Sequence, residues 1–122
     1  MDLGKLGEDL TRRHYEQLGF RLLEQNYVFR HGRQSGELDL IMVKGQELVF
    51  VEVKTRASKK FGTAFESVDF FKQRKLVRTV KLYLAQHPKY QDYSYRIDVA
   101  AVDVDNRSEP VIILTNAVED SD

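Results

Sequence analysis

The chain has 122 residues, 42% of them hydrophobic and 31% charged, which is the size and composition of one globular domain. It has no cysteine, which excludes disulfides and thiolate metal sites, and no run of about 18 apolar residues, so no transmembrane helix is expected. The net charge of zero hides an asymmetry, because nine basic and only two acidic residues lie between Lys54 and Lys81.

The first residues predict a helix over 3–18. They lack the basic and apolar regions of a secretory signal, so a cytoplasmic location is expected. Glu8 falls on the shoulder of the apolar face, and Gly19 is the expected stop. Glu8 is either an acid favoured by the helix dipole or a carboxylate that reaches a site at the edge of the core. The expected apolar face consists of Leu3, Leu6, Leu10, His14 and Leu18.

Residues 20–30 predict a strand that is interrupted near Asn26, where a bulge or turn fits. A polar loop is expected over 31–36. Its Arg33, with Arg30 before it, is either a contact for a phosphate backbone or part of a mobile surface loop.

Two apolar runs, 38–43 and 48–53, predict an antiparallel hairpin around a Gly45-Gln46 turn. In that register Asp39 lies directly opposite Glu52. Opposed side chains hold their Cβ atoms roughly 4.5–5.5 Å apart, where like charges repel. The strands are apolar on both faces, so these carboxylates need a compensating cation. Either Lys54 and Glu37 complete an ion-pair network, or a divalent ion such as Mg²⁺ binds between the two acids.

A basic, flexible segment is expected over 55–62, followed by a helix over about 69–85 with Asp69 or Ser67 as N-cap. Gln73 lies in line with the apolar stripe of that helix. It either bonds nearby backbone or reaches the site and orients water or phosphate. The basic residues of 54–81 indicate either a surface for a phosphate backbone or a solvated helix face.

Strands are expected over 93–104 and 110–115, the second at a sheet edge. Arg96 and Asp98 share one face of the first, as an internal ion pair or a brace for a helix, or with a role beside the site. The three histidines have no ligand spacing, which excludes a zinc site. Residues 1–116 are expected to form the domain, and 117–122 are expected to lie outside it. The acidic segment from Asn116 to the last residue is expected to be frayed.

The order Asp39, twelve residues, Glu52-Val53-Lys54 is the core signature of the PD-(D/E)XK nucleases. Beyond it, the chain resembles the YraN-like family of small bacterial endonuclease-like proteins along essentially its whole length. Leu38 stands where the signature of the superfamily often has proline. The resemblance is carried by Gly7-Glu8, Asn26-Tyr27, 36–41, 49–56, Phe61-Gly62, Lys72-Gln73 and 96–98.

This resemblance implies a restriction-endonuclease-like three-layer α/β/α fold with a mixed sheet of about five strands, similar to archaeal Holliday junction resolvases. It implies Mg²⁺ or Mn²⁺ on Asp39, Glu52 and the Val53 carbonyl, and Lys54 as the catalytic lysine. Glu8 would be an auxiliary acid and Gln73 the helix glutamine. The residues expected to bind nucleic acid are Arg33, Arg56, Lys59, Lys60, Lys72, Arg74 and Lys75.

The function expected is metal-dependent hydrolysis of phosphodiester bonds, with DNA favoured over RNA and branched or damaged DNA as candidate substrates. Cutting both strands of a duplex needs two sites, so a homodimer is an open alternative to a monomer. Two further readings remain. One is a binding module that keeps the fold without turnover, and the other is a structural protein in which the acids form only an ion network.

Overall fold

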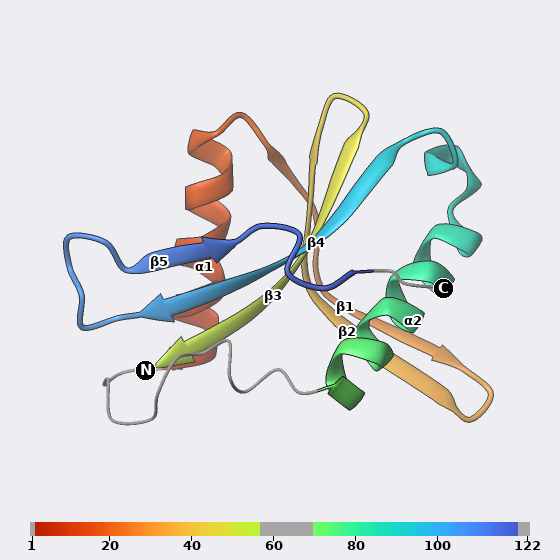
Figure 1. Cartoon of the computed structure of the whole chain (residues 1–122), viewed down its shortest axis with the longest axis horizontal. Coiled ribbons are helices and arrows are strands. Elements are labelled where there is room, and N and C mark those ends of the chain that lie inside the picture. Colours follow the sequence, from red (N-terminus) through yellow and green to blue (C-terminus); the bar gives the residue numbers. More distant parts are fainter. Residues whose placement is uncertain (1, 57–69, 120–122) are drawn as a thin grey trace.

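The computed structural model describes residues 2–56 and 70–119 of the chain. They form a mixed five-stranded sheet of order β1-β2-β3-β4-β5, in which β3 and β4 are parallel and the other neighbours antiparallel (Figure 1). The expected mixed sheet with flanking helices is confirmed. The elements are α1 (Leu3–Gln17), β1 (Arg21–His31), β2 (Gln34–Lys44), β3 (Glu47–Arg56), α2 (Phe70–Gln86), η3 (Pro88–Tyr90), β4 (Ser94–Asp103) and β5 (Val111–Leu114).

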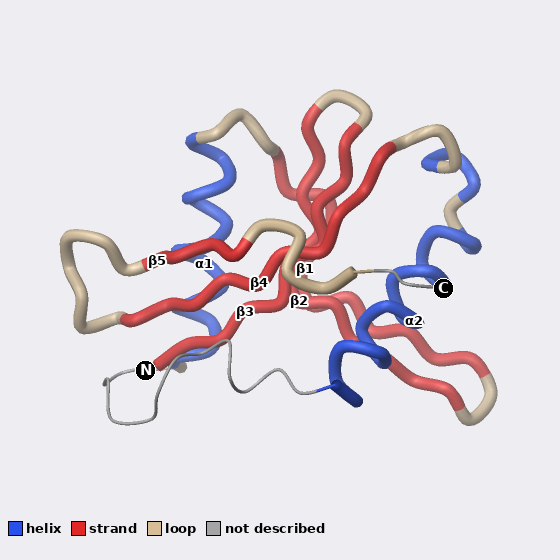
Figure 2. Tube along the Cα trace, viewed as in Figure 1, coloured by secondary structure: helices blue, strands red, loops and turns tan. Residues whose placement is uncertain are grey.

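The two long helices cover opposite faces of the sheet, as alternation along β3 shows. Val51 packs in a core cluster with Tyr15 of α1, whereas Phe50 packs in a second cluster with Tyr83 of α2. Figure 2 shows α1 beside β4 and β5, and α2 beside the β1–β2 pair. Among residues 2–56 and 70–119, no helix has the length and apolar character needed to cross a membrane.

Each helix approaches its strand at a glycine that faces a threonine. A methyl group on Gly7 of α1 would overlap the side chain of Thr55 on β3, and one on Gly36 of β2 would overlap Thr79 of α2. Backbone can come this close only where a Cβ atom is missing. These two contacts fix the distance of both helices from the strands that carry the acids.

The buried face of α1 differs from the expected one. Gly7, Thr11 and Tyr15 are the buried residues of the helix, while Leu3 and Leu18 are 40% and 52% exposed. The predicted face is wrong at its two ends, whereas Leu6 and Leu10 between them are partly buried. The close approach to β3 at Gly7 places Gly7, Thr11 and Tyr15 at the centre of the buried face instead. The helix ends at Gln17, and the expected stop, Gly19, follows the C-cap residue with a φ of 95°.

The segment expected as a polar loop over 31–36 is instead the end of a long hairpin. β1 runs to His31 and β2 begins at Gln34, so the turn is only Gly32-Arg33, with Gly32 at φ 61°. The prediction is wrong because a hairpin arm that projects from the sheet can be polar on exposed faces and still pair its backbone.

The acidic C-terminal segment is anchored where it begins. The Asn116 N–H donates to Asp98 Oδ1 at 2.8 Å, the Ala117 N–H donates to the Ile97 carbonyl at 2.9 Å, and Val118 is buried. The expectation of a frayed tail is therefore wrong for 116–118. The expected N-caps of α2 and residues 57–62 of the expected basic segment lie outside the described residues. The prediction is wrong for Thr55 and Arg56, which end β3 and pair with β4.

Candidate functional site

Asp39 and Glu52 lie where the sheet forks. β2 and β3 pair as far as Leu40 and Val51, in the register expected from the two-residue turn. Beyond that pair, β2 runs with β1 along α2, while β3 runs with β4 toward the side of α1 (Figure 1). Asp39 and Glu52 are the next residues after the last pair, one on each arm of the fork.

β2 changes the face that it presents at Asp39. Leu38 packs in the core cluster of α2 and Leu40 in that of α1, although residues two apart in a regular strand share a face. On the other side, Asn26 stands opposite Asp39 in the register and has φ 54°. The expected interruption near Asn26 is confirmed, and it coincides with the acid.

Asp39 is surrounded mainly by other acids. Its Oδ2 accepts a hydrogen bond of 2.9 Å from the Val53 N–H. The pKa of Asp39 is raised to about 7, with burial as the largest cause and the charge of Glu52 as the next. The Val53 hydrogen bond lowers the pKa, while Glu8 and Glu37 add smaller increases. The strongest electrostatic influence on this carboxyl is therefore repulsive.

Glu52 differs from Asp39 in having a cation beside it. Its Oε1 lies 3.4 Å from Lys54 Nζ, as expected for residues two apart on one strand. Burial raises the pKa of Glu52, and the Lys54 ammonium works against that rise. One ammonium thus balances one carboxylate. The ion pair expected in the alternative exists on Glu52, whereas Asp39 accepts a hydrogen bond from a backbone N–H.

Glu8 lies at the edge of the fork. The Gln25 side chain donates to its Oε1 at 3.2 Å, and its charge contributes to the raised pKa of Asp39. The close contact of neighbouring Gly7 with Thr55 positions this part of α1 against β3. The helix-shoulder position expected for Glu8 is the one that the structure shows.

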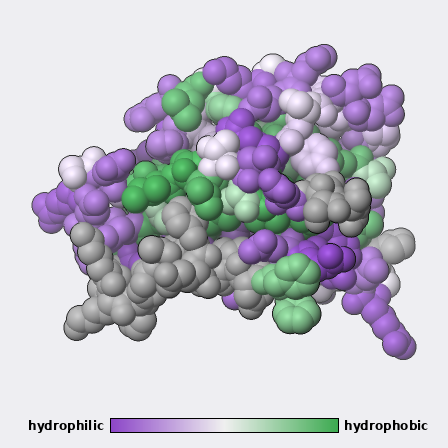
Figure 3. Space-filling model, in the orientation of Figure 1, coloured by the Kyte–Doolittle hydropathy of each residue, from purple (hydrophilic) through white to green (hydrophobic). Residues whose placement is uncertain are grey.

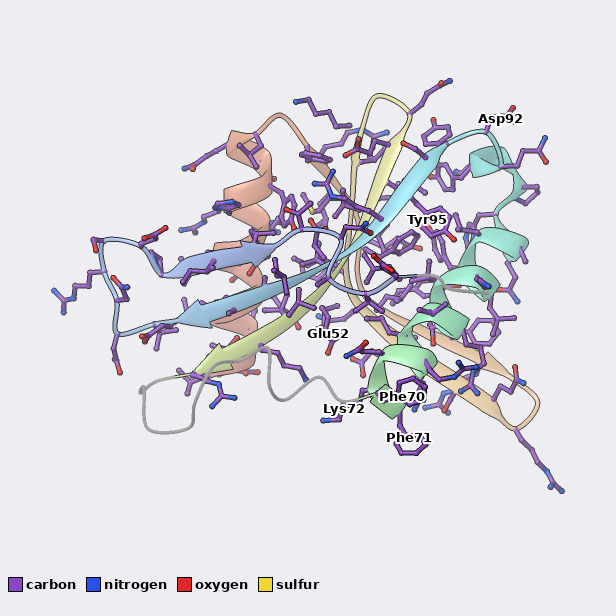
Figure 4. All side chains as sticks on the ribbon, in the orientation of Figure 1. Glu52, Phe70, Phe71, Lys72, Asp92 and Tyr95 are labelled. Carbon is purple, nitrogen blue, oxygen red and sulfur yellow. The ribbon has the colours of Figure 1, made fainter. Side chains whose placement is uncertain are left out.

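A hollow of about 350 Å³ opens on the α2 side of the fork. Figure 4 shows Glu52 on the strand facing the start of α2, with Lys72 near it. The residues that line the hollow are Glu37, Glu52, Lys54, Lys72, Lys75, Leu76 and Thr79. From the sequence, Glu37 was expected only as a member of the alternative ion-pair network. No sequence signal pointed to Thr79, because its place in the wall depends on packing against Gly36.

The residues expected to bind nucleic acid do not all lie together: some line the hollow at the fork, one lies along the hairpin, and the others lie elsewhere. Lys72 and Lys75 line the hollow at Glu52. Arg33 lines a second hollow of about 450 Å³ along the β1–β2 hairpin, and this hollow shares Lys75 and Glu37 with the first. The shared residues make one path from the fork to the hairpin tip.

The remaining residues of that set lie elsewhere. Arg74 lines a wider hollow of about 610 Å³ on the other flank of α2, and Gln73 lines it too. Arg56 ends β3, in register with Asp103. Lys59 and Lys60 lie outside the described residues.

Arg96 and Asp98 form the expected ion pair, with Arg96 Nε 3.1 Å from Asp98 Oδ1. Asp98 is fully buried and accepts a hydrogen bond of 2.7 Å from the Tyr15 hydroxyl, while Arg96 also pairs with Glu47. This network lies on the α1 face and holds the helix, β4 and the C-terminal segment together.

The donors at the fork suit a hard divalent ion. Asp39 and Glu52 offer carboxylate oxygens and Val53 a carbonyl, and Mg²⁺ is bound by one or two carboxylates together with waters and substrate phosphate. Within 2–56 and 70–119, no three side chains of His, Cys, Asp or Glu are grouped so that they could hold an ion. An ion here would therefore use two carboxylates and would keep positions open for water and phosphate.

Comparison with known proteins agrees with the motifs. A "UPF0102 protein" of Stutzerimonas stutzeri is 39% identical over 116 residues, covering 95% of this chain and 93% of the relative. One from Ectopseudomonas mendocina is 43% identical over 101 residues (83% and 82%), and one from Caldanaerobacter subterraneus 37% over 100 residues (82% and 78%). The family model described as "Uncharacterised protein family UPF0102" matches residues 7–102, from the helix glycine to the end of β4. The chain belongs to the uncharacterised protein family UPF0102, the YraN family that its motifs resemble.

Proposed function

We propose that the protein is a metal-dependent endonuclease of the PD-(D/E)XK type that hydrolyses phosphodiester bonds in DNA. The observation that carries the proposal is the fork itself. Asp39 and Glu52, on diverging strands, are close enough for the charge of Glu52 to raise the pKa of Asp39. Glu52 and Lys54 line a hollow whose opposite wall is the basic helix α2.

Asp39, Glu52 and the Val53 carbonyl would hold Mg²⁺ or Mn²⁺. When bound, such an ion polarises a phosphate oxygen and lowers the pKa of a bound water. The Val53 N–H orients Asp39 by bonding one of its oxygens, which leaves the other available. Glu8 lies at the edge as an acid that reaches the site directly or through water.

Lys54 has a separate role on the substrate. Its ammonium lies beside Glu52 and lines the hollow where phosphate would enter. A protonated amine there binds the phosphate and offsets the charge that develops on it in the transition state. Its contact with the Glu52 carboxylate places this positive charge at the site, so Lys54 is proposed as an electrostatic and water-positioning residue.

The path from the fork to the hairpin tip supports binding of a strand by its phosphates. Lys72 and Lys75 lie on α2, and Arg33 and Arg30 lie on the hairpin. Such contacts bind the backbone without reading sequence. Cutting both strands of a duplex requires two such sites, which a homodimer would supply.

The second candidate is a nucleic-acid-binding module without turnover. It is favoured by the small number of metal-ligating side chains at the site. The described part of the chain supplies two acids there and no group of three His, Cys, Asp or Glu side chains that could hold an ion. Such a module would use the same basic path.

The test is incubation of the protein with single-stranded, duplex and branched DNA in Mg²⁺, Mn²⁺ or chelator. Asp39→Asn and Lys54→Ala are expected to lose metal-dependent nicking by at least about 100-fold, the scale of one electrostatic group. Lys5→Ala, an exposed change on α1, is the matched control and should retain full activity. Salt-sensitive binding without cutting by the wild type would support the module, and neither binding nor cutting would refute both.

A further inference from the structure

The start of α2 exposes two adjacent aromatic side chains. Phe70 and Phe71 are 63% and 81% exposed, and their rings meet edge to face with centroids 5.9 Å apart. Exposed rings forgo the stabilisation that burial would contribute. A neighbouring pair of such rings beside the basic residues at the start of the helix indicates a binding surface.

The rings border a hollow of about 610 Å³. Arg74 holds its guanidinium 5.6 Å above the Phe70 ring, and Arg78 and Lys81 continue the wall, with Glu119 as the acid on the far side. Figure 3 shows an isolated apolar patch at the start of α2 among hydrophilic side chains. The surface thus combines aromatic rings with an excess of positive charge.

The same helix serves the fork on its other flank. Lys72 lines the hollow that contains Glu52, Phe70 and Phe71 line the wider one, and Lys75 lines both. Figure 4 shows Phe70, Phe71 and Lys72 together at the start of α2, with Glu52 on the strand beside it. A polynucleotide in the fork would therefore pass within reach of the two rings.

We propose that Phe70 and Phe71 are a stacking platform for unpaired nucleobases next to the fork. The inference rests on the proposed function in one respect, that the ligand is nucleic acid. Aromatic rings stack on the face of any base, and basic residues between them bind the backbone. Because a duplex hides the faces of its bases, the platform selects a nucleic acid with a single-stranded segment beside the site, such as a fork, flap or gap.

The experiment measures binding without cutting. A fluorescent single-stranded DNA of about 16 nucleotides, which spans one binding site of this kind, and its duplex are titrated in chelator at fixed salt. The proteins are the wild type, the double variant Phe70→Ala/Phe71→Ala, the double variant Phe70→Tyr/Phe71→Tyr, and Leu18→Ala as control. Leu18 is 52% exposed at the end of α1 and tests the loss of an exposed apolar side chain elsewhere.

The alanine variant is expected to bind the single strand about 5–100-fold more weakly, the scale of stacking one base, and the duplex unchanged. The tyrosine variant keeps a ring and should bind as the wild type does. A 2-aminopurine base in the single strand should be quenched by the wild type and the tyrosine variant but not by the alanine variant.

Four results would overturn the inference. These are an equal loss for duplex and single strand, no loss, no binding of either DNA by the wild type, or conversion of a wild-type dimer to a monomer in the alanine variant. The last result, seen in sedimentation, would mean that a second copy covers the rings. Adding Mg²⁺ to the same mixtures separates the two proposals. Cutting without an effect of the rings overturns only this inference, and ring-dependent binding without cutting overturns only the catalytic function.

Discussion

Asp39 combines burial with the charge of Glu52 nearby, and both disfavour its ionisation. A carboxyl in this position is costly for the folded protein unless a cation reaches it. An internal ion pair would already hold its cation and would not carry this cost. The cost therefore distinguishes a site that takes its cation from solution from an internal ion pair.

The cost predicts a stability effect that depends on pH. The pKa of Asp39 rises from 3.8 to about 7 on folding. The stabilisation linked to its proton is therefore complete below about pH 4 and is lost as the pH rises through about 7. In chelator, Asp39→Asn should raise the free energy of unfolding at pH 8 by on the order of one to a few kcal/mol, and much less at pH 5. Urea denaturation at the two pH values measures this difference.

The matched control is Asp92→Asn, an exposed residue far from Glu52 in Figure 4. It should change stability equally at both pH values. If Asp39→Asn instead destabilised the metal-free protein at pH 8, Asp39 would be part of a stabilising ion network, and the proposed metal site would lose its main support.

At the scale of elements, the docking of α2 on β2 depends on the missing side chain of Gly36. A Cβ there would overlap Thr79, whose hydroxyl donates to the Lys75 carbonyl at 2.9 Å. Gly36→Ala should lower the free energy of unfolding by about 1–3 kcal/mol, the usual effect of overpacking. It should also move Lys75 relative to Glu52 and weaken DNA binding.

The double variant Gly36→Ala/Thr79→Ala should recover part of that loss, because the second change removes the atoms that clash. A double-mutant cycle measured by urea denaturation gives the coupling between the two positions. Gly4→Ala is the control, since a Cβ there would meet only the flexible Asp2 side chain at 3.3 Å. Strictly additive effects at Gly36 and Thr79 would contradict the contact.

The sequence predicted those parts of the fold that local chemistry determines. The Gly45-Gln46 turn fixes the register of its hairpin, and the register alone brings Asp39 and Glu52 to matching positions. Glu52 and Lys54 follow from the period of two. Boundaries of α2 and β4 came within about one residue of the structure because their patterns are long and regular.

The parts that were missed depend on tertiary contact. The leucines dominate the sequence pattern of α1, so Gly7 and Thr11 were not predicted to be on its buried face. They are buried because α1 approaches β3 closely at Gly7. The reversal of faces at Asp39 arises from the fork and has no local sequence signal. Val118 lies in an acidic run, and only its packing on the core shows that the chain is anchored there.

For the whole molecule, Asp98 joins parts that are distant in sequence. Its carboxylate binds Arg96, the Tyr15 hydroxyl of α1 and the Asn116 N–H. Asp98→Asn weakens the hydrogen bonds at this buried position, and because Arg96 is partly exposed and keeps Glu47 as a partner, the expected cost is about 1–3 kcal/mol. Thermal melting should show this loss, and Tyr15→Phe, which removes one donor, should show about 1–3 kcal/mol. Equal stability of Asp98→Asn and wild type would show that the network contributes nothing to stability.

The fork also makes metal binding a property of the whole molecule, because its two carboxylates come from different arms of the sheet. Asp39 belongs to the arm that carries α2, and Glu52 to the strand on which α1 packs. An ion bound to both would stabilise the folded state only, so Mg²⁺ or Mn²⁺ should raise the melting temperature with increasing concentration. Deprotonation of Asp39 must accompany binding, and its pKa of about 7 means that the increase should be larger at pH 8 than at pH 6. Asp39→Asn should abolish the increase, whereas Asp92→Asn should keep it. An increase that persists in Asp39→Asn, or that falls with rising pH, would place the ion elsewhere on the protein and leave the fork without its proposed ligand.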